Sequence, residues 1–138
     1  MSGDADLALL LSTIYLSKKH VKGRKRLQKT VCILKYEHGV PFQFQFRPYF
    51  YGPYSEQLAE AINVLEAVGL VMEIEEKLPS GVLQYDYYLT KKGEAVAEDM
   101  LSKNVPETES VSKLKKAVSK ISQLETSQLV AIAKSVLH

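Results

Sequence analysis

The order of hydrophobic periodicities along the chain limits its fold more than any other feature. Apolar residues recur at helical spacing over 5–19, 24–38 and 55–68. Within residues 41–50, the phenylalanines at 42, 44 and 46 alternate with polar side chains, which is typical of a short strand with one buried face, and residues 70–90 resemble a hairpin. The sequence therefore predicts a mainly helical α+β chain with the order helix, helix, short strand, helix and hairpin.

Turn and capping residues support these boundaries. Pro48 disfavours a central strand, because proline cannot donate to a neighbouring strand, so we expect the 41–50 segment to lie at the edge of a sheet or to run into a loop. Ser55 is a good N-cap for the third helix, and Thr90 can cap a fourth helix over 91–103. We therefore expect each of these two helices to begin directly after a capping side chain.

Two further amphipathic stripes, at 111–124 and 126–137, follow a predicted linker at 104–108. Two short amphipathic helices are not stable by themselves, so they must pack on the body of the protein or on a partner. We expect residues 1–103 to form one domain and 108–138 a helical hairpin that packs on it or forms a dimer seam. The strongly apolar first helix would contribute to such a homodimer.

Composition excludes several classes of protein. Of the 138 residues, 46% are hydrophobic and 25% are charged, as in globular proteins that bury a core. No apolar run reaches the roughly 18 residues of a membrane span, so we expect no membrane contact. The apolar run at 7–11 follows two aspartates and is too short for a signal peptide. The single cysteine, Cys32, excludes an intramolecular disulfide and suits a reducing cytoplasm, where we expect it to be a small buried hydrophobe.

The sequence contains no recognisable catalytic pattern. The three histidines have no metal-ligand spacing with each other or with the cysteine. The chain also lacks a phosphate-binding glycine-rich loop, a nucleophile elbow and a metalloprotease helix. We therefore expect a protein that is not an enzyme and that holds no cofactor and no metal.

Charge is distributed unevenly although the formal net charge is only +2. Seven basic residues and no acid lie between positions 18 and 29: Lys18, Lys19, Lys22, Arg24, Lys25, Arg26 and Lys29. Six acidic residues and no base lie between positions 54 and 76: Glu56, Glu60, Glu66, Glu73, Glu75 and Glu76. A near-neutral chain is thus strongly polarised.

The basic cluster predicts a phosphate contact. Arg24, Lys25 and Arg26 occupy the first turn of the predicted second helix, where free N–H groups and cationic side chains together suit phosphate. We expect backbone contacts to duplex nucleic acid from all seven basic residues, with Lys91 and Lys92 as additions. Two alternatives remain: a solvated basic turn that pairs with local carboxylates, and a surface for an acidic protein.

The acidic third helix argues against ordinary sequence readout, since its carboxylates would be repelled by the charged backbone of a duplex. Its expected outer face carries Gln57, Glu60 and Asn63, and the hairpin adds Glu73 and Glu75. These five side chains predict a surface for a protein partner. The glutamates at 73, 75 and 76 are otherwise explained as a solvated face.

Aromatic residues are concentrated in one short stretch. Seven of the twelve lie within 13 residues: Phe42, Phe44, Phe46, Tyr49, Phe50, Tyr51 and Tyr54. One hypothesis is a stacking platform for single-stranded nucleic acid or an edge that binds a partner. The other, which we favour, is that one face is core and the tyrosines hold the turn before the third helix, because a small domain without tryptophan needs those rings for burial. Gln43, Gln45 and Arg47 would then be exposed.

Three stretches are similar to the YwgA-like family of small bacterial and archaeal proteins: Gly23-Arg24-Lys25-Arg26-Leu27-Gln28-Lys29, Tyr51-Gly52-Pro53-Tyr54-Ser55 and Leu65-Glu66-Ala67-Val68-Gly69-Leu70. The second stretch also resembles, more remotely, the Panacea-type domains found in many antitoxins. Tyr88-Leu89-Thr90-Lys91-Lys92-Gly93 resembles the strand-to-helix junction after the wing in many winged-helix regulators. The likeness covers roughly residues 6–100.

The element order and these resemblances together imply a winged helix-turn-helix with a C-terminal two-helix extension. In such proteins the helix before the wing, here 55–68, normally enters the major groove. We expect a nucleic-acid-binding regulator or antitoxin-like module whose contacts are dominated by phosphates. The alternative is an adaptor that uses the acidic helix and the wing to bind a partner chain such as a toxin.

Overall fold

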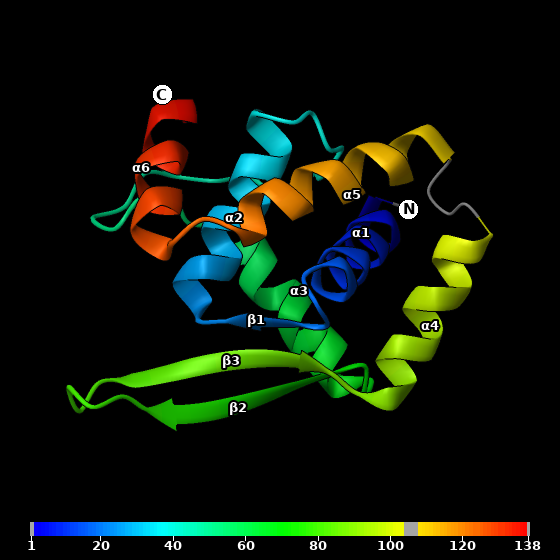
Figure 1. Cartoon of the computed structure of the whole chain (residues 1–138), viewed down its shortest axis with the longest axis horizontal. Coiled ribbons are helices and arrows are strands. Elements are labelled where there is room, and N and C mark those ends of the chain that lie inside the picture. Colours follow the sequence, from blue (N-terminus) through cyan, green and yellow to red (C-terminus); the bar gives the residue numbers. More distant parts are fainter. Residues whose placement is uncertain (1, 104–107, 138) are drawn as a thin grey trace.

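The computed structural model describes residues 2–103 and 108–137 and shows a mainly helical α+β chain (Figure 1). In chain order its elements are α1 (Ser2–Leu16), β1 (His20–Lys22), α2 (Arg24–Tyr36), α3 (Glu56–Ala67), β2 (Val71–Lys77), β3 (Leu83–Leu89), α4 (Lys91–Ser102), α5 (Thr108–Ser122) and α6 (Thr126–Val136). The mainly helical α+β class is confirmed, and the predicted hairpin is present as β2 and β3. The predicted linker at 104–108 lies, apart from its last residue, outside the described residues.

The sheet is antiparallel, and its strands lie in the order β1-β3-β2. The central strand β3 pairs with β1 through Tyr88 opposite His20, and with β2 through Leu89 opposite Val71. The sequence pattern did not predict β1. Three residues are too few to produce a periodic pattern, and β1 forms only because the distant β3 supplies its hydrogen bonds.

The strand predicted over 41–50 does not form, so this prediction is wrong. The alternation itself is real, because Phe42, Phe44 and Phe46 are buried while the polar residues between them are exposed, as predicted. The segment, however, does not pair with any strand of the sheet, and its backbone pairing is limited to an isolated antiparallel bridge between Arg47 and Tyr54. The N–H of Gln43 donates to the Asp6 carboxylate at 2.8 Å, and that of Gln45 donates to the Gln57 side chain at 2.7 Å. Side chains from α1 and α3 therefore hold an extended segment in place.

The helices on either side of the hairpin begin where their caps predict. Ser55 accepts a hydrogen bond from the N–H of Leu58 at 3.2 Å, and Thr90 accepts one from the N–H of Gly93 at 2.9 Å. The Thr90 hydroxyl also donates to the Gly69 carbonyl at 2.7 Å, which joins α4 to the end of α3. Each such cap contributes about 1 kcal/mol to stability.

One continuous core joins the N-terminal and C-terminal helices. The helix α1 contacts α3, α4 and α5, and α6 lies along α2 (Figure 1). The apolar stripes of the last two helices are buried in this core: Leu114, Ala117, Val118, Ile121, Leu129 and Ala133. Full burial of each large aliphatic side chain contributes about 1.5–3 kcal/mol. Because these stripes are used within the chain, the homodimer stays a prediction.

Cys32 is fully buried in α2, as predicted, and burial raises the pKa of its thiol to about 11. Among the helices that the structure describes, none is both long enough and apolar enough to cross a membrane.

Candidate functional site

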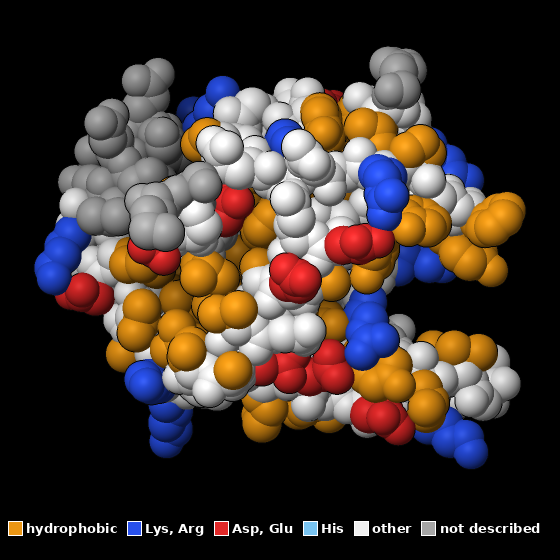
Figure 2. Space-filling view, turned by 180° about the vertical axis from the view of Figure 1, so that it is seen from behind, with side chains coloured by type: hydrophobic (Ala, Val, Ile, Leu, Met, Phe, Trp, Pro, Cys, Tyr) orange, Lys and Arg blue, Asp and Glu red, His pale blue; other side chains and the backbone are white. Residues whose placement is uncertain are grey.

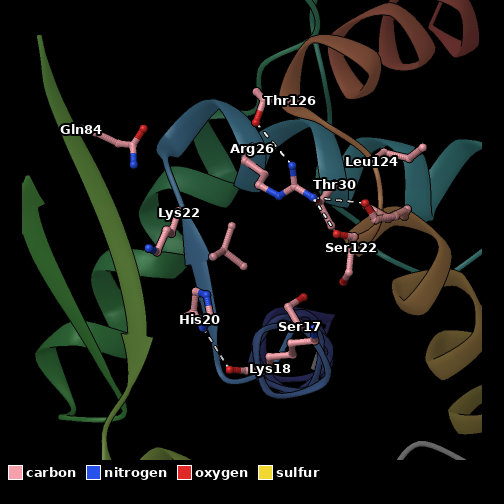
Figure 3. Close-up of a pocket in the computed structure, with 12 residues that line it drawn as sticks. Ser17, Lys18, His20, Lys22, Arg26, Thr30, Gln84, Ser122, Leu124 and Thr126 are labelled. Carbon is pink, nitrogen blue, oxygen red and sulfur yellow. Dashed lines mark hydrogen bonds between the residues drawn. The ribbon is translucent and has the colours of Figure 1, made fainter. Parts of the chain in front are cut away.

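A groove lies between β1, the start of α2 and the turn that joins α5 to α6 (Figure 3). It encloses about 480 Å³. Four of its lining residues are basic: Lys18, His20, Lys22 and Arg26. The hydroxyl groups of Ser122 and Thr126, at the α5–α6 turn, lie opposite them. None of the described residues that line it carries a carboxylate. We call it the basic groove.

The turn before β1 places Lys18 at the basic groove. Lys18 and Lys19 have φ angles of 61° and 70°, in the left-handed region that residues other than glycine rarely occupy. Such a backbone conformation costs on the order of 1 kcal/mol per residue and persists only where the surrounding structure fixes it. Here the N–H of Lys19 donates to the Tyr15 carbonyl at 3.1 Å, and a ring nitrogen of His20 lies 3.0 Å from the Lys18 carbonyl. The two lysines diverge, since Lys19 forms a 3.0 Å ion pair with Glu94 of α4.

Gly23 connects β1 to α2 and leaves the start of α2 uncapped. Its φ of 102° is accessible mainly to glycine, and it has no side chain that could accept a hydrogen bond from the first turn. The first backbone bond of α2 runs from the N–H of Leu27 to the Gly23 carbonyl. The N–H groups of residues 24–26 therefore remain for solvent or for an anionic ligand.

The three consecutive cations at the start of α2 do not form one cluster. The Arg24 guanidinium lies 3.9 Å from the ring centroid of Tyr85 and 3.6 Å from the Glu73 carboxylate. Lys25 is exposed, and its ammonium lies 4.8 Å from the ring centroid of Tyr51. Of the three, Arg26 alone lines the basic groove, so the cations predicted to contact phosphate together lie in three different environments.

Arg26 has a structural role as well as a charge. Its guanidinium donates to the carbonyls of Ile121 at 3.2 Å and Ser122 at 3.5 Å, and to the Thr126 hydroxyl at 3.4 Å (Figure 3). A cation at the last carbonyls of α5 is favourable for that helix. Burial lowers the pKa of Arg26, but no carboxylate compensates its charge among the described residues around it. It therefore contributes positive potential to the basic groove while it fixes the α5–α6 turn.

The remaining predicted phosphate contacts lie elsewhere. Lys29 is only 3% exposed and donates to the Pro53 carbonyl at 2.7 Å. Lys91 and Lys92 are exposed in the first turn of α4 and do not line the basic groove. The structure thus brings together Lys18, Lys22 and Arg26 at the basic groove, with Lys25 on the adjacent turn.

The five residues predicted to bind a partner also lie in different environments. Gln57 accepts the hydrogen bond from the 41–50 segment described above, and Glu73 is half-buried beside Arg24. Glu60, Asn63 and Glu75 are exposed. Figure 2, which views the molecule from behind Figure 1, shows Asp and Glu side chains that lie among hydrophobic ones.

Sequence reasoning missed one side of the site. The hydroxyl side of the basic groove comes from residues about 100 positions after Arg26, and nothing in the local sequence points to that contact. Lys113, Lys116 and Lys120 on α5 are exposed but do not line the basic groove.

No protein-family model matches the chain. It is 39% identical over 85 residues to YwgA of Bacillus subtilis (strain 168), which is described as an uncharacterized protein. The match covers 62% of this chain and 50% of YwgA, so the chain spans about half the length of the curated relative. This identity supports the relation to YwgA-like proteins that the three sequence stretches indicate.

Proposed function

We propose that this chain is a winged-helix protein that binds nucleic acid through backbone phosphates, at the basic groove and the first turn of α2. The order helix, strand, helix, helix, hairpin and the sheet order β1-β3-β2 support this proposal, in which β2 and β3 form the wing. The resemblance to regulators and the remoter one to Panacea-type domains favour a regulator or an antitoxin-like module.

The observation that carries this proposal is the absence of carboxylates from the described lining of the basic groove. Lys18, Lys22 and Lys25 are exposed and have no described carboxylate within 4.0 Å. Their charges are therefore available to a phosphate backbone, with Arg26 behind them. Such contacts supply affinity and orientation but little sequence discrimination.

The helix before the wing does not fit major-groove readout. The exposed residues of α3 include Glu56, Glu60 and Asn63, and its one ion pair, from Glu56, reaches Arg47 at 2.7 Å. With no basic side chain on α3 itself, its surface would be repelled by a duplex. The proposed contact surface therefore lies on the opposite side of α2 from α3.

A charge-matched pair of double variants tests the site. We expect Lys18→Asn with Lys22→Ala to weaken binding of a random duplex about tenfold at ~50 mM salt, since two phosphate contacts are lost. Asparagine is chosen for position 18 because it tolerates positive φ. Lys91→Ala with Lys92→Ala removes the same charge outside the basic groove and should change affinity less than about twofold. Fluorescence anisotropy measures both; equal weakening by the two double variants would contradict the proposed site.

A second function, binding of a protein partner, is favoured by one observation on the other side of the molecule. Val64, Val68, Met72 and Ile74, from the end of α3 and from β2, are each 42–50% exposed near exposed glutamates. Apolar side chains with a charged rim are typical of a protein contact surface. A duplex affinity that is absent at ~50 mM salt would favour this adaptor function over the first proposal.

A further inference from the structure

A second pocket lies on the other side of the first turn of α2 from the basic groove. Tyr49, Tyr51 and Tyr54 line it together with Arg24, Lys25 and Lys29, and Gln28 and Gly52 complete the lining. It encloses about 350 Å³, and its accessible lining is almost entirely apolar. We call it the tyrosine pocket. In Figure 2 a notch separates the segment around residues 48–54 from the tip of the β2–β3 hairpin, on the same edge of the molecule.

Burial in the core does not explain the aromatic residues at this pocket. Phe42, Phe44 and Phe46 are at most 7% exposed, so they serve the core as predicted. Tyr49 and Tyr51 are 49% and 70% exposed, and Phe50 between them is 94% exposed. Tyr54 meets Tyr49 edge to face, with ring centroids 5.4 Å apart. Exposed rings beside an apolar pocket are available to stack on a planar ligand.

The charges around the tyrosine pocket favour an anion. Three of its lining residues are cationic, and none of the described lining residues is acidic. The ammonium of Lys25 already lies against the ring of Tyr51, so a cation and an aromatic face are adjacent at the rim. Lys29 is buried at the pocket, and its ammonium is held by a backbone carbonyl with no carboxylate within 4.0 Å in the described chain.

We propose that the tyrosine pocket accepts an unpaired base of a single-stranded nucleic acid, while Lys25 contacts the phosphate of the same nucleotide. The base provides a planar surface on which Tyr51 and Tyr49 can stack. The phosphate of the same nucleotide provides a negative charge for the lysines, which have no acidic partner in the described lining of the pocket. The strand would continue past the start of α2 to the basic groove. This inference rests on the proposed function and adds that the chain distinguishes single strands from duplex.

The test compares two neighbouring aromatic residues. An eight-nucleotide oligo-thymidine carrying a fluorophore is titrated with wild type and with the Tyr51→Ala and Phe50→Ala variants at the same low salt. We expect Tyr51→Ala to weaken binding about tenfold, because one base loses the ring on which it stacks. Phe50→Ala, next to the pocket but outside its lining, should change affinity less than twofold. Tyr51→Phe keeps the ring and should keep most of the affinity.

A duplex measurement with the same proteins separates this inference from the proposed function. Tyr51→Ala should bind a random duplex as tightly as wild type does, because a paired base cannot enter the pocket. If Tyr51→Ala binds the single strand like wild type while wild type still binds duplex, the base site is refuted and the proposed function stands. If wild type binds neither nucleic acid at ~50 mM salt, the proposed function fails, and the base site with it.

Discussion

Replacing Gly93 with alanine is expected to destabilise this protein by about 3 kcal/mol or more. A Cβ atom at position 93 would lie 2.0 Å from the carbonyl oxygen of Leu70 and 3.0 Å from its carbonyl carbon. That oxygen also accepts the N–H of Thr90 at 3.1 Å, so it belongs to the junction between the sheet and α4. Backbone atoms cannot move aside as a flexible side chain can, so α4 would have to shift as a unit.

The expected loss is opposed by only a small gain, since alanine favours a helix over glycine by about 1 kcal/mol. Gly3→Ala in α1 is the matched control, because no described atom beyond its chain neighbours and the backbone of its own helix lies within 4 Å of the added methyl group. It should leave stability unchanged or raise it by up to about 1 kcal/mol. Urea unfolding followed by circular dichroism measures both. A Gly93→Ala protein as stable as wild type would refute the close packing of α4 on the start of β2.

Lys29 is expected to make stability depend on pH. Burial lowers the pKa of its ammonium from 10.5 to about 8, and two nearby lysines, Lys25 and Lys134, act in the same direction. The unfolded chain therefore binds more protons than the folded chain between about pH 8 and pH 10.5, and the free energy of unfolding rises with pH in this window. At about 1.4 kcal/mol per pKa unit, the contribution of Lys29 rises by about 3 kcal/mol across it.

The contribution is isolated by comparison with Lys29→Met, which fills similar space without a titrating group. Cys32 and Tyr87 have pKa values raised by burial to about 11 and about 12, so they lower stability at high pH and must be cancelled. Cys32→Ala is therefore introduced into both proteins, and Tyr87 is common to both. We expect the free energy of unfolding of the protein that keeps Lys29, minus that of the Lys29→Met variant, to rise by about 3 kcal/mol from pH 7 to pH 10.5. A constant difference would show that Lys29 is solvated, contrary to its burial.

The sequence predicted those parts of the fold that depend on local pattern. Ser55 and Thr90 are recognisable caps because a cap acts within three residues of itself. The burial of Phe42 and Phe44 was predictable from alternation, but the absence of a strand there was not. It depends on Asp6 and Gln57, which bond to that backbone from helices distant in sequence.

The site was predictable in composition but not in arrangement. The run of cations from Lys18 to Lys29 is visible in the sequence, yet the structure gives its members different partners. Lys19 and Arg24 form ion pairs with glutamates of α4 and β2, and the buried ammonium of Lys29 donates to a backbone carbonyl. Such pairings depend on which elements pack together, and a count of charges along one segment does not contain that information.

The dependence of duplex affinity on salt tests the central claim most directly. With Lys18, Lys22 and Lys25 as phosphate contacts, the logarithm of the association constant should fall with the logarithm of salt concentration at a slope of about −2.7, which is −0.9 for each contact. The Lys18→Asn, Lys22→Ala, Lys25→Ala variant should show a slope close to zero between about 50 and 200 mM salt. No measurable duplex binding at ~50 mM salt, or the same slope in both proteins, would contradict a function based on these three lysines.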